Sequence, residues 1–162
     1  MSEVEMEKPA SYDVFISYYS GSARDFARYL KKSLMDFGLT SFLDEEDIPK
    51  SIEKATDEWR SYIDNSIEKS ANFILLMTHG FNKRQEVMRE IKKAIEAGKK
   101  MFLFKHEPLG IYDLTIEIDN KPIDLSKYEY TQFNNENDLV RKVIASLLGK
   151  IGQKRESSFM NQ

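Results

Sequence analysis

Short apolar runs alternate with longer amphipathic stretches through most of this sequence, and this alternation restricts the fold more than any other feature. The apolar runs contain four to six residues and end at polar or turn-forming residues, as β-strands do. The third and fourth runs, NFILLM and MFLF, are apolar at nearly every position, which is typical of strands covered on both faces of a parallel sheet. The five predicted strands are residues 14–17, 40–43, 72–77, 101–104 and 130–133.

The stretches between the strands carry apolar residues at i, i+3 and i+4, the spacing of a helix with one buried face. Glycines follow three of these stretches and supply stop signals. Strands that alternate with helices predict an α/β fold, in which helices cover both faces of a parallel sheet. The four predicted helical stripes lie within residues 23–37, 59–70, 87–95 and 139–148.

The composition indicates one globular domain that binds neither nucleic acid nor membrane. The 162 residues are 41% hydrophobic, and their net charge of −3 lacks the basic excess of a nucleic-acid-binding protein. The chain has no cysteine, which excludes disulfides and thiolate chemistry and is compatible with a cytoplasmic location. No run approaches the roughly 20 apolar residues of a membrane helix. We expect a domain at residues 12–150 between flexible tails at 1–11 and 151–162.

Ligands of an open parallel sheet bind beyond the carboxyl ends of its strands, where the strand order reverses. If the order is 2-1-3-4-5, the crevice lies between the first and third strands. One wall is the turn from Ser17 to Gly21, and the other is residues 78–85. Backbone N–H groups at the start of the helix suit a phosphate, whereas Ser20 or Ser22 could equally cap that helix.

The residues at these strand ends exclude two common chemistries of doubly wound folds. A phosphate-accepting receiver would need acidic residues after the first strand and an aspartate after the third, but the sequence has Ser17-Tyr18 and Thr78-His79. The G-x-G-x-x-G fingerprint of a dinucleotide fold is absent. The short Ser20-Gly21-Ser22 run leaves a flavodoxin-like nucleotide binder as an alternative.

The segment YDVFISYYS resembles the first box of TIR domains, the Toll/interleukin receptor homology domains. Three later segments resemble further parts of the same family in the same order: GLTSFLDEEDI, IDNSIEKSANFILLMT and FNKRQEVMREIKKA. Together they cover about residues 12–150. The resemblance implies the flavodoxin-like TIR fold, a five-stranded parallel sheet of order 2-1-3-4-5 with helices on both faces.

Many TIR domains cleave the bond between nicotinamide and ribose in NAD+, and they depend on one glutamate of the third helix. Residue matching places that glutamate at Glu90, on the border of the apolar helix stripe. Nicotinamide leaves as a neutral ring, so one carboxylate can suffice by stabilising an oxocarbenium-like transition state. The resemblance thus implies an NAD+ hydrolase or cyclase of signalling or immune defence, with no metal and no cofactor besides its substrate. Family enzymes often carry Trp-Cys where this chain has Glu86-Val87.

The position of the crevice and this resemblance together predict a set of substrate-binding residues. These are Ser17, Tyr18, Tyr19, Ser20, Gly21, Asp44, Thr78, His79, Phe81 and Glu86. Phe81 either stacks on a base or packs under the third helix, and Trp59 is predicted to be a core residue. The charged run at 44–54 is either a solvated loop or a segment that covers the site and contacts other TIR domains during self-association. The alternative function is a non-catalytic TIR interaction module.

Overall fold

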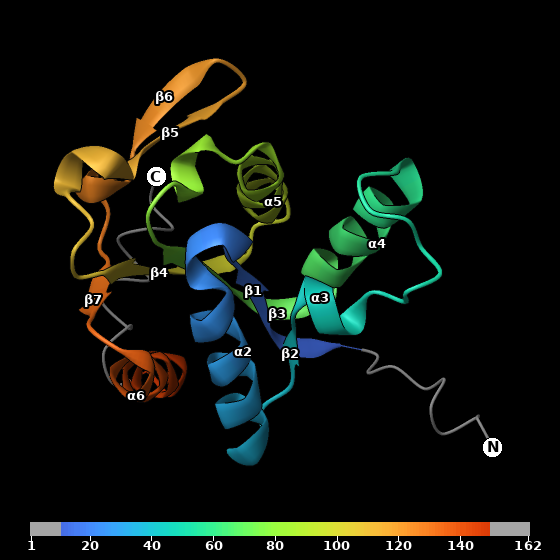
Figure 1. Ribbon diagram of the computed structural model, residues 1–162, viewed down its shortest axis with the longest axis horizontal. Helices are drawn as coiled ribbons and strands as arrows, with labels where there is room; N and C mark the ends of the chain where they lie inside the picture. Colours follow the sequence, from blue (N-terminus) through green and yellow to red (C-terminus); the bar gives the residue numbers. More distant parts are fainter. Residues whose placement is uncertain (1–10, 150–162) are drawn as a thin grey trace.

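Five parallel strands form the central sheet, in the order β2-β1-β3-β4-β7 (Figure 1). The computed structural model describes residues 11–149, so the predicted tails lie outside the described residues, apart from Ser11. The predicted order is confirmed, with β7 as the fifth strand of the sheet. The strands are β1 (Tyr12–Ser17), β2 (Ser41–Phe42), β3 (Ser70–Met77), β4 (Lys100–His106) and β7 (Thr131–Phe133).

Four long helices cover the two faces of this sheet, as the sequence predicts (Figure 1). Apolar residues of α2 and α6 join one core cluster, and those of α4 and α5 join the other. Two of the helices have a side-chain N-cap. The Thr56 hydroxyl accepts a hydrogen bond from Trp59 N at the start of α4, and the Asn135 side chain accepts one from Asp138 N at the start of α6. The helices are α2 (Ser20–Asp36), α4 (Asp57–Glu68), α5 (Gln85–Glu96) and α6 (Glu136–Leu147).

Strand β1 divides its side chains between the two core clusters. Val14 and Ile16 pack toward α2 and α6, whereas Phe15 lies on the side of α4 and α5. Phe15 stacks on Phe42 and Phe73, with ring centroids 5.2 and 5.5 Å apart. Because side chains alternate along a strand, Ser17 follows Phe15 onto the face that α5 covers.

The structure adds elements that the sequence does not predict. An antiparallel hairpin, β5 (Thr115–Ile118) and β6 (Lys121–Asp124), packs against α5 and forms a separate two-stranded sheet. A short helix, α3 (Asp44–Asp47), begins the charged run predicted as a loop. Within residues 11–149, none of the helices combines the length and the apolar character that crossing a membrane requires. The remaining elements are the 3-10 turns η1 (Phe81–Lys83), η2 (Ile111–Leu114) and η3 (Leu125–Lys127).

Candidate active site

A buried carboxylate lies where α5 crosses the carboxyl end of β1. Glu90 is only 7% exposed, although the other buried residues of α5 are Val87, Ile91 and Ala94. The fully buried Ser17 hydroxyl donates a hydrogen bond of 2.6 Å to Glu90 Oε1. The residue that ends the first strand therefore holds the glutamate in place, 73 positions later in the chain.

Burial raises the pKa of Glu90 well above its ordinary value, because the carboxylate loses the water that would stabilise its charge. The neighbouring carboxylates of Asp44 and Glu86 raise this pKa further, while the Ser17 hydrogen bond and Arg89 lower it. The surroundings of Glu90 therefore disfavour its charged form compared with a glutamate in water. A cation placed beside Glu90 would favour the carboxylate instead.

Asp44 brings a second carboxylate to the same place from the start of α3. The Tyr18 hydroxyl donates a hydrogen bond of 2.6 Å to Asp44 Oδ1, and Glu45 N donates one of 2.7 Å to the same oxygen. Burial raises the pKa of Asp44, and these two hydrogen bonds oppose the shift. Burial and the Asp44 charge also raise the pKa of Tyr18, so this phenol stays a hydrogen-bond donor.

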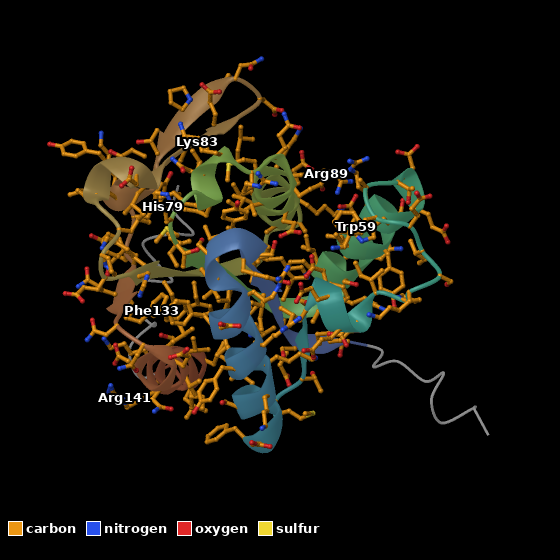
Figure 2. All side chains as sticks on the ribbon, viewed as in Figure 1. Trp59, His79, Lys83, Arg89, Phe133 and Arg141 are labelled. Atoms are coloured by element: carbon orange, nitrogen blue, oxygen red, sulfur yellow. The ribbon has the colours of Figure 1, made fainter. Side chains whose placement is uncertain are left out.

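A cleft of about 250 Å³ opens beside Glu90. Of the sequence-predicted site residues, it gathers Tyr18, Tyr19, Ser20, Asp44 and Glu86 around the glutamate. The sequence did not single out the other lining residues as site residues: Lys54, Ala55, Trp59, Arg84 and Val87. Trp59 is buried as predicted, but it also borders the cleft from α4 (Figure 2).

Ala55 enters this cleft with an unusual backbone conformation. Its φ of 64° lies in the left-handed region, which costs a residue with a side chain about 1 kcal/mol. Strain of this kind persists where neighbouring structure holds the chain, and it is often found at functional sites. Ala55 and Lys54 together bring the connection between α3 and α4 to the edge of the cleft.

At the two positions where the family resemblance implies Trp-Cys, the structure has an ion pair and a core residue. Glu86 accepts from Arg60 of α4, with Arg60 Nη2 at 2.9 Å from Glu86 Oε2. Val87 is buried against the core. The side of the cleft at the first turn of α5 is therefore charged, and α4 neutralises that charge.

The turn after β1 holds its shape through contacts that sequence reasoning did not predict. Neither Ser20 nor Ser22 caps α2, because Tyr19 is the N-cap residue and makes no side-chain capping bond. The Ser22 hydroxyl instead lies 2.7 Å from both Thr78 Oγ1 and the His79 carbonyl oxygen. This link ties the first turn of α2 to the end of β3.

The remaining predicted site residues lie away from the cleft beside Glu90. Phe81 is fully buried in the core cluster, so the structure favours packing under α5 over stacking on a base. His79 is exposed and lies apart from Trp59 (Figure 2). Thr78 is buried, and its hydroxyl is hydrogen-bonded to that of Ser22. Gly21 and Ser20 line a neighbouring hollow.

Comparison with protein families gives a match to a model described as the TIR domain, over residues 14–144. A search of curated proteins finds no match.

Solved structures share the fold at low sequence identity. The TIR domain of the Toll-related receptor TRR-2 from Hydra magnipapillata is 16% identical, with a TM-score of 0.61 over 89% of this chain and 98% of that one. A TIR-STING receptor from C. gigas is 19% identical, with a TM-score of 0.63 over 88% of this chain and 41% of the receptor. The CMP N-glycosidase BcmB from Clostridium botulinum is 17% identical, with a TM-score of 0.54 over 81% and 96% of the two chains.

Proposed function

Because the chain belongs to the TIR domain family, we propose that it cleaves the N-glycosidic bond between nicotinamide and ribose in NAD+. The observation that carries this proposal is the buried Glu90, held by Ser17 at the edge of a cleft. Burying a carboxylate costs stability, so a carboxylate desolvated at the edge of a cleft is a candidate for a functional group. The same fold also serves an N-glycosidase that acts on CMP.

In this mechanism the pyridinium ring of NAD+ binds beside Glu90 and favours the ionised carboxylate. The bond from ribose C1′ to the ring nitrogen breaks, its electron pair leaves with the nitrogen, and nicotinamide departs as a neutral molecule. The carboxylate stabilises the positive charge that develops on the ribose. Water then gives ADP-ribose and a proton, or the adenine of the same molecule gives a cyclic isomer.

The second candidate is a non-catalytic module that acts through other TIR domains, since TIR domains typically self-associate. The Arg60–Glu86 ion pair at the cleft edge favours this candidate, because it stands where related enzymes have tryptophan. Under either candidate we propose a cytoplasmic role in signalling or immune defence.

Nicotinamide release decides between these candidates. The purified chain is incubated at high concentration with NAD+, and nicotinamide, ADP-ribose and cyclic products are separated by chromatography. The catalytic proposal expects nicotinamide and one ribosyl product in equal amounts. Assembled, folded protein that leaves NAD+ intact would rule out the enzyme and leave the interaction module.

We expect kcat/KM for NAD+ to increase as the pH rises through the pKa of Glu90. Since burial and the Asp44 charge raise this pKa, the midpoint should lie well above 4.5, the ordinary value for a glutamate. Glu86→Gln should move the midpoint to lower pH, because the Glu86 charge also raises the pKa of Glu90. A profile that is flat from pH 5 to 9 would contradict the role of Glu90.

A further inference from the structure

We propose that Arg84 binds the diphosphate of the substrate, so that the site selects a dinucleotide over an uncharged nucleoside. This inference rests on the proposed function, because it concerns the same cleft and the same class of substrate. The supporting observations are the charges in the cleft, the cation–π contact of Arg84 and its position on α5 relative to Glu90.

The cleft contains more carboxylates than cations, and most of its charges have partners. Three carboxylates and two cations line it: Asp44, Glu86, Glu90, Lys54 and Arg84. Arg60 neutralises Glu86, and Tyr18 donates to Asp44. None of the ion pairs found among residues 11–149 involves Arg84, whose guanidinium contacts an aromatic ring instead. Arg84 is thus a cation at the cleft that no carboxylate within the described part of the chain neutralises.

The Tyr19 ring orients this guanidinium. Arg84 Cζ lies 4.8 Å from the centroid of the ring, the arrangement of a cation–π contact. Two glycines make room for the ring: a methyl group on Gly21 would come within 2.3 Å of Tyr19 Cζ, and one on Gly80 within 3.2 Å of Tyr19 Cε2. A cation–π contact uses the charge of the guanidinium but not its N–H hydrogen bonds, and these N–H groups can bind phosphate in a bidentate manner.

The position of Arg84 on α5 suits a nucleotide whose ribose reacts at Glu90. Arg84 is the N-cap residue of α5, and Glu90 lies six residues further along the helix. At 1.5 Å per residue the two positions are about 9 Å apart along the axis. A nucleotide whose ribose lies at Glu90 can span this distance with its 5′-phosphate at the start of the helix, where Arg84 lies.

Calorimetric titration with ADP-ribose tests the site without requiring catalysis. We expect Arg84→Gln to weaken ADP-ribose binding about 10- to 100-fold, because it removes charge-assisted hydrogen bonds to phosphate. The matched control is Lys83→Gln, which removes the same charge one residue earlier. Lys83 is exposed and lines a different hollow, beside the β5–β6 hairpin (Figure 2). This control should change the affinity less than twofold.

Arg84→Lys separates charge from geometry, since it keeps the cation but loses the planar fork. It should bind ADP-ribose with intermediate affinity. Equal affinities of wild type and Arg84→Gln, or equal losses in Arg84→Gln and Lys83→Gln, would overturn the proposal, as would a wild type that binds no ADP-ribose. If binding depends on Arg84 but NAD+ stays intact, the anion site stands and the proposed activity falls. If wild type cleaves NAD+ but Arg84→Gln binds ADP-ribose normally, the proposed activity stands and the anion site at Arg84 falls.

Discussion

Replacing Glu90 with glutamine is expected to lower the rate of nicotinamide release by about 10³-fold, the largest effect on activity that we predict. The amide has nearly the same shape and can still accept the hydrogen bond from Ser17. It cannot carry the negative charge that stabilises the ribosyl cation. Initial rates at saturating NAD+ measure the loss. The control is Glu96→Gln, which makes the same change at an exposed position of α5 and should keep the wild-type rate.

Glu90→Gln should lose activity without losing stability. The pKa of Glu90 is higher in the folded protein than in the unfolded chain. Its contribution to the free energy of unfolding is therefore fully present below the unfolded pKa, where the residue is protonated in both states, and is lost as the pH rises through the folded pKa. Glutamine stays neutral at every pH. Thermal unfolding at pH 8 should therefore give the variant a Tm at least equal to that of wild type, and the difference should shrink toward pH 4.5. An active variant, or one that unfolds at lower temperature at pH 8, would argue against a buried catalytic carboxylate.

Truncating Phe81 to alanine is expected to destabilise the protein by about 3–5 kcal/mol, the largest effect on stability that we predict. Its ring is completely buried in the cluster under α5, so removing it leaves a cavity that the rigid sheet cannot fill. Urea unfolding with constant m-value measures the change in the free energy of unfolding.

Tyr112→Ala is the matched control, since it truncates an aromatic ring that is 95% exposed, and it should change stability by less than about 0.5 kcal/mol. If Phe81→Ala kept its stability but bound NAD+ poorly, Phe81 would be a ligand-stacking residue after all.

The strands and helices were predictable because each follows from a local pattern, whereas the order of the strands was implied by the family resemblance. Buried strands such as β3 are apolar on both faces, and each long helix has one apolar stripe. The hairpin β5–β6 escaped prediction because its strands pair only with each other and expose much of their surface. Helix α3 has no apolar pattern at all. The Asp47 carboxylate accepts a hydrogen bond from Leu43 N and pairs with Lys31 of α2, so distant contacts hold this turn.

The candidate site, like the fold, contains residues that could be predicted from the sequence and others that could not. Glu90, Asp44 and Tyr18 could be predicted because each follows a recognisable strand or lies on a matched helix, and the structure brings them together. Lys54 and Arg84 could not, because their positions depend on how a long connection folds and on a ring that lies over two glycines. No local sequence pattern encodes those arrangements.

The alternation of β1 also has a consequence for engineering this protein. Ser17 donates its hydrogen bond to Glu90 on one face of the strand, while Val14 and Ile16 pack only into the core beneath α2 and α6. Substitutions that fill or rigidify the core around Val14 and Ile16 can therefore raise stability with little effect on Glu90, as long as Tyr18 of the same cluster is kept. The face under α5 offers no such freedom, since a shift there moves the serine that holds the carboxylate. A thermostable form is best sought by redesigning one face of the sheet and leaving the other as it is.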